Sequence, residues 1–537
     1  MEMLHCFLLF SFLGITHAQS FHNFMSCSQT PYPDLCFHFI KPNHNVPTTD
    51  VHQSYHITRF RNSAIRATLN QAMVAHHHLL SSMDLASFHD DDRVKSALID
   101  CLELYEDSIT ELNRSVMNSM KANSIGHLTL LSASLANHQT CRDGFRDFGF
   151  SSHYLNNIIF PHQILSNFSK LISNSLAITK AAAVTATTSS TPGSQRLLAG
   201  SFPKWVSGDD RMLLRDTTEK RTDMVVAQDG SGNFRTISEA VAAAAEVRKG
   251  SERRFVIYVK GGIYRENVVI KKTLKNVMMI GDGMGETIVT AMKNVKDGST
   301  TFRSATFAVV GEGFIAKDMT FENRAGAEKH QAVALRTNAD RSIFYRCSFK
   351  GYQDTLYAHS NRHFFRECHI YGTIDFIFGD GASVFQNCNI FVRKPMENQK
   401  NTVTAQGRSD PNENTGFVIH NSVVRAAPDL KAVEGVYKTY LGRPWKAYSR
   451  TVVMRSFLDG LIEPAGWLPW AGDFGLKTVY YGEFKNSGGG ASTMRRVQWP
   501  GYHVMTTAAE AERFTVESFL EGGGWIPGTG VPFANGV

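Results

Sequence analysis

Two patterns of hydrophobic positions divide the chain. Between about residues 55 and 176, apolar side chains recur every three or four positions, as at Leu98, Cys101, Leu102, Tyr105 and Ile109, while Gly and Pro are scarce. This spacing is typical of amphipathic helices. We therefore expect an all-α first part that packs as a four-helix bundle.

Beyond residue 221 the pattern changes to short apolar runs rich in β-branched and aromatic residues, separated by Gly and Asn every eight to twelve residues. Such runs predict strands. Three segments repeat the form Phe-x-x-Cys, at 344–349, 365–370 and 385–390, with their cysteines 21 and 20 residues apart. A period near 20 with one strand per copy predicts an all-β, right-handed parallel β-helix.

Two further segments set the domain boundaries. The apolar run from Cys6 to Ile15, followed by small residues ending at Ala18, predicts a secretory signal over 1–18. The stretch 177–216 is rich in Ala, Thr, Ser and Gly and predicts a flexible linker. These boundaries leave a helical pro-region over 19–176 and a β domain over 217–537.

The linker carries two basic-dileucine sequences, which begin at Arg196 and Arg211 and where a processing protease could cut. The alternative, which composition alone favours, is an ordinary linker with chance Arg-Leu pairs. No segment other than the signal approaches the roughly 20 apolar residues that a membrane-spanning helix needs. We expect a secreted, soluble protein with no membrane partner.

Composition and charge narrow the function. Hydrophobic residues make up 42% and charged residues 20% of the 537 residues, which excludes wholesale disorder. The net charge of +7 is uneven: residues 1–214 hold 15 Lys+Arg against 16 Asp+Glu, and residues 215–537 hold 41 against 33. The basic β domain favours an acidic polymer as its partner.

Cysteine spacing predicts cross-links in both parts, because an exported protein meets an oxidising compartment. In the first part we expect two bridges, such as Cys27–Cys36 and Cys101–Cys141. The first part also holds two N-glycosylation sequons, at Asn113 and Asn167.

In the second part, residues one period apart lie on adjacent strands about 4.8 Å from each other. Cys368 and Cys388 are therefore expected to stack and to form a bridge, with Cys347–Cys368 as the competing pair.

The repeat also places two carboxyl groups together. Asp354 and Asp375 are 21 residues apart, which is one coil period, so they should lie side by side. Two neighbouring carboxylates cannot both ionise easily, and one is expected to act as an acid while the other acts as a nucleophile or base. The alternative is a structural ladder of aspartates that satisfies turn backbones, and spacing alone does not separate the two.

The surroundings of this pair favour chemistry. Gln353 adjoins the first aspartate, Gln331 lies about one longer coil upstream, and a Gly/Pro loop supplies Arg443 and Trp445. Two amide donors, an acid, a nucleophile, a guanidinium and an aromatic plate suit acyl transfer on a saccharide. Signatures of serine hydrolases, phosphate-binding loops and zinc peptidases are absent from the sequence.

With these residues the chain resembles the plant pectin methylesterases that carry an N-terminal inhibitor-like pro-region. The resemblance rests on five segments of the β domain, namely 261–266, 331–335, 351–357 (Gly-Tyr-Gln-Asp-Thr-Leu-Tyr), 371–379 and 441–445 (Leu-Gly-Arg-Pro-Trp). The first part resembles the pectin methylesterase inhibitor domain through 30–36, 100–105 and 137–144, and in that family the bridges join the first two and the next two cysteines.

The resemblance implies a mechanism on the C6 methyl ester of a galacturonosyl unit. Asp375 would attack the ester carbonyl, while Gln331 and Gln353 stabilise the oxyanion. Asp354 would protonate the departing methanol and then activate the water that hydrolyses the acyl-enzyme.

The resemblance further implies that Arg443 orients Asp375, that Trp445 packs on the sugar and that Thr301 contacts the substrate. It implies no metal and no organic cofactor. The expected partners are pectin, which is methyl-esterified homogalacturonan, a processing protease at the linker and a proteinaceous pectin methylesterase inhibitor. The expected state is a monomer in the plant cell wall, with no nucleic-acid partner.

Two rival functions remain open on the sequence. Paired carboxyl groups about 5 Å apart also suit a retaining glycosidase, so a polysaccharide hydrolase or lyase on the same fold is one rival. The other is a binding protein in which the helical part works and the β part is a scaffold.

Overall fold

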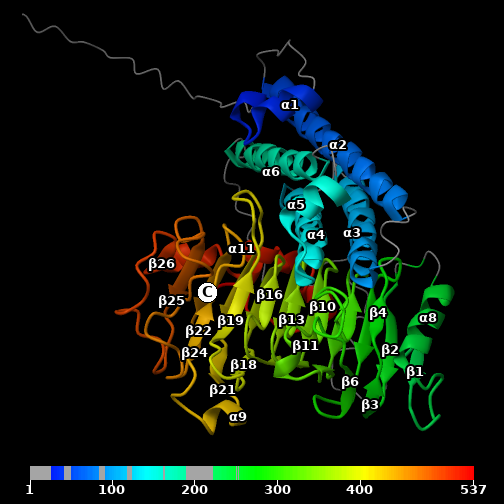
Figure 1. Cartoon of the computed structure of the whole chain (residues 1–537), viewed down its shortest axis with the longest axis vertical. Helices are drawn as coiled ribbons and strands as arrows, with labels where there is room; N and C mark the ends of the chain where they lie inside the picture. The colour runs from blue at the N-terminus through cyan, green and yellow to red at the C-terminus, as the bar shows by residue number, and fades with distance from the viewer. Residues whose placement is uncertain are drawn as a thin grey trace, which may run out of the picture.

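The computed structural model of the chain describes residues 26–40, 50–83, 91–117, 124–160, 164–188, 222–248, 251 and 253–537. A helical domain (residues 26–188) stands on the side of a β-helix domain (residues 222–537), as Figure 1 shows. The predicted signal and both basic-dileucine sequences lie outside the described residues.

Four long helices form the helical domain: α2 (Asp50–Met83), α3 (Asp92–Met117), α4 (Ser124–Asp147) and α6 (Ile164–Thr188). Helix α2 packs against α3 and α6, and α4 packs against the same two, so the four close into a ring. This arrangement confirms the four-helix bundle. The short elements are η1 (Cys27–Gln29), α1 (Pro33–Phe39), α5 (Ser152–Tyr154) and η3 (Leu155–Ile159).

Both bridges predicted for this domain are present. Cys27–Cys36 ties η1 to α1, and Cys101–Cys141 ties α3 to α4. Helix α6 continues to Thr188 and so runs into the predicted linker, because the Ala-rich sequence after Lys180 has a high helix propensity. None of the described helices is both long and apolar enough to span a membrane.

The β domain is built from three sheets in which every strand pair is parallel. The eleven-strand sheet contains β1 (Met224–Val226), β2 (Phe255–Val259), β5 (Val277–Ile280), β8 (Ile315–Lys317), β11 (Ser342–Tyr345), β14 (Arg362–Arg366), β17 (Ala382–Gln386), β20 (Gly416–His420), β23 (Arg450–Met454), β25 (Tyr480–Phe484) and β26 (Tyr502–Val504).

The seven-strand sheet contains, in spatial order, β22 (Thr439–Gly442), β19 (Asn401–Gln406), β16 (Ile377–Gly379), β13 (Leu356–Ala358), β10 (Leu335–Thr337), β7 (Phe307–Val309) and β4 (Val268–Ile270). The eight-strand sheet contains β24 (Phe457–Leu458), β21 (Val423–Ala426), β18 (Asn389–Val392), β15 (His369–Gly372), β12 (Ser348–Lys350), β9 (Thr320–Asn323), β6 (Thr287–Ala291) and β3 (Gly262–Arg265).

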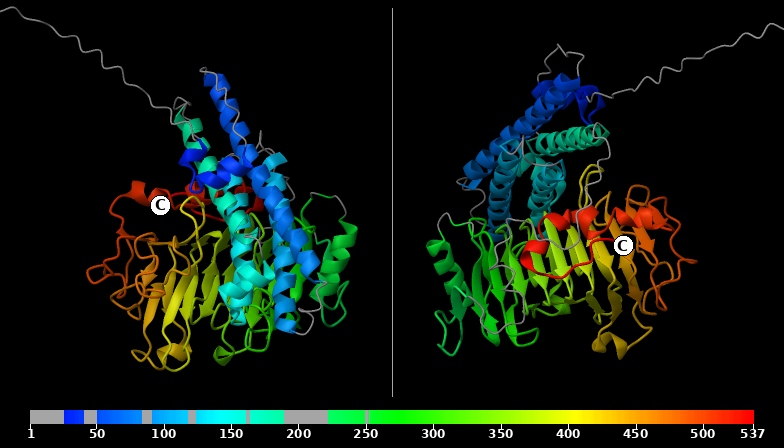
Figure 2. Two further views of the ribbon diagram at one scale, coloured as in Figure 1. Left: turned by 45° about the horizontal axis from the view of Figure 1, so that its top comes forward. Right: turned by 180° about the vertical axis from the view of Figure 1, so that it is seen from behind.

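Short helices decorate the β-helix. They are α8 (Ile237–Val247), which packs on the first coil, η4 (Ala327–Lys329), α9 (Pro428–Lys431), α10 (Ala508–Glu512), α11 (Val516–Leu520), η5 (Gly522–Gly524) and η6 (Pro527–Thr529). Figure 2 shows the C-terminal helices on the back of the β-helix, away from the α3–α4 pair.

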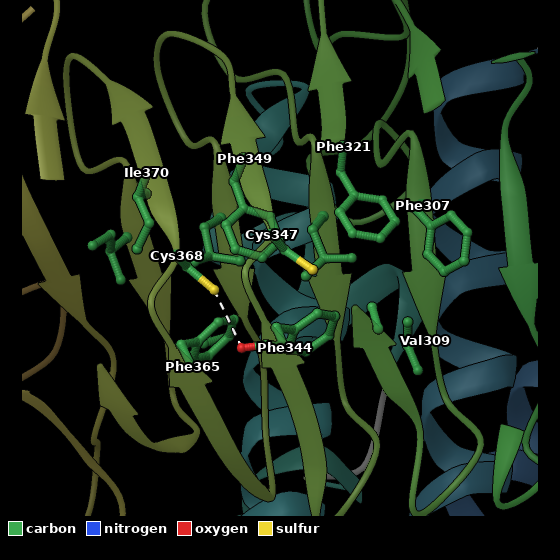
Figure 3. Packing of buried hydrophobic residues seen from close by; sticks show 14 of the residues in the cluster. Phe307, Val309, Phe321, Phe344, Cys347, Phe349, Phe365, Cys368 and Ile370 are labelled. Atoms are coloured by element: carbon green, nitrogen blue, oxygen red, sulfur yellow. Dashed lines mark hydrogen bonds between the residues drawn. The ribbon is translucent and has the colours of Figure 1, made fainter. Parts of the chain in front are cut away.

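Each of the central coils supplies one strand to each sheet, and the repeat seen in the sequence is the coil repeat. Phe344 pairs with Phe365, and Phe365 with Phe385, on the strands β11, β14 and β17. The three rings stack in the interior with centroids 5.0 and 4.7 Å apart, and Figure 3 shows the first two, Phe344 and Phe365. This regular register confirms the parallel β-helix.

The three cysteines of the repeat correct one prediction. Cys347, Cys368 and Cys388 are buried free thiols, so the Cys368–Cys388 bridge is absent, as is the competing Cys347–Cys368 bridge. The Cys368 Sγ donates to the Phe344 carbonyl oxygen at 3.2 Å, as Figure 3 shows, and the Cys388 Sγ donates to the carbonyl of Phe365. Side chains stacked on adjacent parallel strands point the same way, so the Cys368 and Cys388 thiols each meet a carbonyl of the coil before them and not each other.

Burial raises the pKa of the Cys368 thiol well above its usual value, and this keeps the sulfur in its unreactive protonated form. Alkylation of the unfolded, unreduced protein should therefore modify Cys347, Cys368 and Cys388, but not the four cysteines of the helical domain. Peptide mass spectrometry tests this, and a disulfide-linked peptide pair containing Cys368 and Cys388 would contradict it.

Candidate active site

Two buried carboxyl groups sit on neighbouring coils of the seven-strand sheet. Asp354 lies two residues before Leu356 and Asp375 two residues before Ile377, and Leu356 pairs with Ile377 across β13 and β16. Both aspartates adopt left-handed backbone angles, with φ of 61° and 51°, a conformation that Asp tolerates better than most residues. The coil register therefore places them side by side, as the 21-residue spacing predicted.

Asp375 is held by strong donors. The Arg443 guanidinium donates from Nε to Oδ1 at 2.8 Å and from Nη2 to Oδ2 at 2.6 Å. The Thr402 hydroxyl donates to Oδ1 at 2.6 Å and accepts from the Asp375 backbone N–H at 2.9 Å. A bidentate, charge-assisted pair fixes the orientation of a carboxylate and satisfies both of its oxygens.

Asp354 has the opposite environment. Its pKa is raised well above the usual range, first because the group is buried and then because the carboxyl groups of Asp375 and Asp147 lie nearby; Arg443 opposes the shift only in part. Burial and like charge both favour the neutral form. The pair is thus divided into a carboxylate held by cationic and hydroxyl donors and a carboxyl group that keeps its proton.

A cavity of about 490 Å³ joins these two groups to the other predicted site residues. It is lined by Asp354, Asp375, Gln331, Gln353, Arg443, Thr301 and Trp445, which are all seven of the predicted catalytic and substrate-binding side chains. The Gln353 carbonyl accepts from the Ala332 N–H at 3.3 Å, so the two glutamines lie on adjacent coils. The structure therefore brings every one of these residues to a single place.

Sequence reasoning missed four contributors. Trp470 lies under the Arg443 guanidinium, 4.4 Å from ring centroid to the central carbon, in a loop without any motif. Tyr357 and Phe378 stack at 4.2 Å on the cavity wall and were visible only as members of the quoted segments. Thr402 follows Asp375 by 27 residues, because this coil is longer than the 20 to 21 residues of the repeat, and counting by the repeat therefore does not find it.

The helical domain forms part of the cavity wall. The last turns of α4 contribute Thr140, Asp143, Gly144, Arg146 and Asp147 to the lining. Figures 1 and 2 show α3 and α4 standing over the middle strands of the seven-strand sheet. The helical domain therefore covers the carboxyl pair.

Polar contacts hold α4 in this place. Asp147 Oδ2 accepts from the Thr301 N–H at 2.7 Å, and Thr140 Oγ1 lies 2.8 Å from His359 Nε2. Lys446 Nζ pairs with Asp143 at 2.8 Å. Apolar side chains of the β-helix, including Phe302 and Tyr357, belong to the same buried cluster as the α3–α4 core.

No cluster of three or more His, Cys, Asp or Glu side chains in the described part of the chain is arranged to hold a metal ion. The donors of the cavity are guanidinium, amide, hydroxyl and carboxyl groups of the protein itself.

Comparison with known proteins identifies the family. Residues 223–523 match the pectinesterase family model, and residues 25–178 match the model of the plant invertase/pectin methylesterase inhibitor family. The chain belongs to the pectinesterase family. Its N-terminal third carries the inhibitor-type domain of the second family.

Curated relatives share this organisation over almost the whole chain. A probable pectinesterase/pectinesterase inhibitor 6 from Arabidopsis thaliana is 51% identical over 98% of this chain and 96% of its own length. Pectinesterase 2 from Citrus sinensis is 48% identical over 95% of this chain and 94% of its own. The solved structure of a pectin methylesterase from carrot is 56% identical, covers 60% of this chain and 100% of its own, and superposes with a TM-score of 0.59.

Two buried aspartates at the contact between the domains indicate that docking of the helical domain on the β-helix depends on pH. Burial raises the pKa of Asp147 to about 7 and that of Asp100 on α3 to about 6, although Thr301 and Arg303 partly oppose these shifts. An exposed aspartate titrates near 4. Docking therefore takes up protons, so its stabilisation is full below about pH 4 and is lost as the pH rises through about 6 to 7.

After a cut within 189–221, the dissociation constant of the two domains should rise by up to about tenfold per pH unit for each proton between pH 5 and 7. Equilibrium binding measured from pH 5 to 8 tests this. In Asp147→Asn the dissociation constant should change less with pH near pH 7. Equal affinities of the unchanged domains at pH 5 and pH 8 would contradict proton uptake by these two aspartates on docking.

Proposed function

We propose that the β-helix domain hydrolyses the C6 methyl esters of pectin, giving pectate and methanol. One observation carries the proposal: a donor-held carboxylate and a protonated carboxyl group lie side by side in one cavity with two glutamines, an arginine and a tryptophan. This arrangement occurs in a chain of the pectinesterase family.

The chemistry follows from the environment of each group. The Asp375 carboxylate attacks the ester carbonyl carbon, and the carbonyl π electrons move to the oxygen, which the Gln331 and Gln353 amides stabilise as an oxyanion. Collapse of this intermediate breaks the carbon–oxygen bond to methanol, which takes the proton of Asp354. A water then loses its proton to Asp354, attacks the acyl carbon and releases Asp375 with the galacturonate.

The remaining residues orient the reaction. Arg443 and Thr402 fix the nucleophile before the substrate arrives, so no reorganisation is needed at the moment of attack. Trp445 offers an aromatic face to a sugar ring, and Thr301 exposes a backbone N–H that Asp147 occupies in the intact chain. The mechanism uses only groups of this chain and needs no metal or organic cofactor.

We further propose that the intact chain is an inactive precursor. The turn of α4 from Thr140 to Asp147 lies on the cavity that the polymer must enter. Cleavage by a protease at Arg196 or Arg211, both outside the described residues, would then separate the domains. Signal-directed secretion to the cell wall, glycosylation at Asn113 and Asn167, a monomeric state and binding of a separate inhibitor protein belong to the same proposal.

Asp375→Ala should lower the rate of methanol release from methyl-esterified pectin by at least about 10³-fold, because the nucleophile is lost. Methanol release and the chain length of the polymer are measured together. Methanol without chain shortening is expected of the unchanged enzyme, whereas shortening would favour a polysaccharide hydrolase or lyase. Asp375→Asn is assayed separately and early, because slow deamidation restores the aspartate.

Thr402→Val provides a graded variant of the same site. It removes the hydrogen bond that the hydroxyl donates to the carboxylate, worth about 1.5–3 kcal/mol, and the one that it accepts from the Asp375 backbone N–H, so kcat should fall by at least roughly 10- to 100-fold. A variant with unchanged kcat would show that Thr402 has no part in orienting Asp375.

The intact chain should release methanol at least about tenfold more slowly than the same chain cut within 189–221 and separated from its helical domain, because substrate must displace a tethered cover. Equal rates before and after the cut would rule out a covering role for the helical domain.

A further inference from the structure

Three cations of the β-helix domain have carboxylate partners only in the helical domain. Lys272, Arg303 and Lys446 form no ion pair with an acid of their own domain in the described structure. Other cations of the β-helix behave differently: Arg362 pairs with Asp340, and Arg346 with Asp318, within the domain. The three cations therefore lack an internal partner once the helical domain leaves.

Five acids of α3 and α4 serve these three cations. Lys272 Nζ lies 3.1 Å from Asp107 and 3.2 Å from Glu111. Arg303 pairs with Asp100 and, at 2.7 Å, with Glu103.

Lys446 Nζ pairs with Asp143 at 2.8 Å. In the described part of the interface only Arg114–Glu312 has the opposite polarity. The helical domain thus presents a row of carboxylates to a row of cations.

The cations flank the reacting pair along the sheet. In the strand order β22-β19-β16-β13-β10-β7-β4, Lys446 follows β22, two strands beyond the strand of Asp375. Arg303 precedes β7 and Lys272 follows β4, two and three strands beyond the strand of Asp354. Counted across the strands at about 4.8 Å each, the cations stand on the order of 10 to 14 Å to either side of the carboxyl pair. Lys272 is also displaced along the strand direction, because it follows its strand whereas the two aspartates precede theirs.

This placement matches an acidic polymer better than a neutral one. A galacturonan that has lost part of its methyl esters carries free carboxylates on the sugars beside the remaining ester. Such a chain lying along the sheet would bring carboxylates to Lys446 on one side and to Arg303 and Lys272 on the other, where salt-sensitive attraction would hold it.

We propose that Lys272, Arg303 and Lys446 are binding positions for the free carboxylates of partly de-esterified pectin, and that the acids of α3 and α4 occupy these positions as substitutes for substrate. The inference rests on the proposed function, because it names how the same site selects its polymer. It assigns to these residues a preference for esters that lie next to sugars already converted.

The test uses the β-helix domain freed by a cut within 189–221. Its ability to fold alone is supported by the carrot structure, which in its entirety matches 60% of this chain. The probe is hexagalacturonate, a fully de-esterified oligomer that the enzyme cannot turn over. Binding is measured by calorimetry at two salt concentrations, for Lys272→Gln, Arg303→Gln, Lys446→Gln and the triple variant.

Each single substitution should weaken binding of hexagalacturonate by about two- to fivefold, and the triple by at least about tenfold with a smaller salt dependence. Lys431→Gln and Lys477→Gln, two exposed lysines outside the cavity lining, are the matched controls and should change binding by less than about twofold. Triple-variant binding equal to that of the controls would overturn the proposal.

Displacement supplies a second measurement that does not depend on the stability of the triple variant. In the cut but still associated protein, hexagalacturonate should release the helical domain, and at a lower concentration when Asp143→Asn is present. If hexagalacturonate binds while the helical domain stays in place, the acids of α3 and α4 do not occupy the positions of substrate carboxylates.

The two proposals fail in distinguishable ways. Binding of hexagalacturonate requires no catalysis. If the freed domain releases methanol from pectin but binds the hexamer equally well without the three cations, only the proposed carboxylate-binding role of these cations is wrong. A freed domain that binds through the three cations but releases no methanol would sink the esterase proposal.

Discussion

The in-register stacking of parallel coils is the constraint on which the site depends. Leu356 pairs with Ile377, and Ile377 pairs with Thr404, so equivalent residues of successive coils lie directly beside each other. Four successive coils each deliver one residue of the nucleophile's surroundings: Asp354, Asp375, Thr402 and Arg443. Because strand side chains alternate with a period of two, a slip of one residue on any coil would send that side chain to the interior. Catalytic geometry and core packing are therefore satisfied by the same register.

Hydrogen bonding and burial divide the work between two chemically identical groups. The Asp375 carboxylate accepts hydrogen bonds from a guanidinium and a hydroxyl, whereas the Asp354 side chain lines the cavity, accepts no hydrogen bond from the described side chains and keeps its proton. The cover contributes to this difference, because Asp147 of α4 lies near Asp354 and, when it is ionised, raises the pKa of Asp354. Departure of the helical domain thus changes the acidity of the site as well as its access.

Much of this could be predicted from the sequence, and the failures have physical causes. The strict repeat around Phe344, Phe365 and Phe385 fixes the coil length, so the fold and the adjacency of Asp354 and Asp375 followed from counting. Thr402 lies on a longer coil where counting fails. The Cys368–Cys388 bridge was wrong because adjacency along a stack does not make side chains converge. The position of α4 over the cavity depends on contacts between distant segments, such as Asp147 with Thr301, which no local pattern encodes.

The two domains are parts of one chain, joined through residues 189–221. A tether of this kind gives the helical domain an effective concentration near the millimolar range, whatever the amount of protein present. A contact made of ion pairs, hydrogen bonds and a shared apolar cluster then keeps the cavity covered even if its affinity between free partners is modest. Once the tether is cut, the same contact must compete at the dilute concentration of its surroundings. Uncovering is therefore irreversible because the covalent link is lost, whatever the strength of the interface.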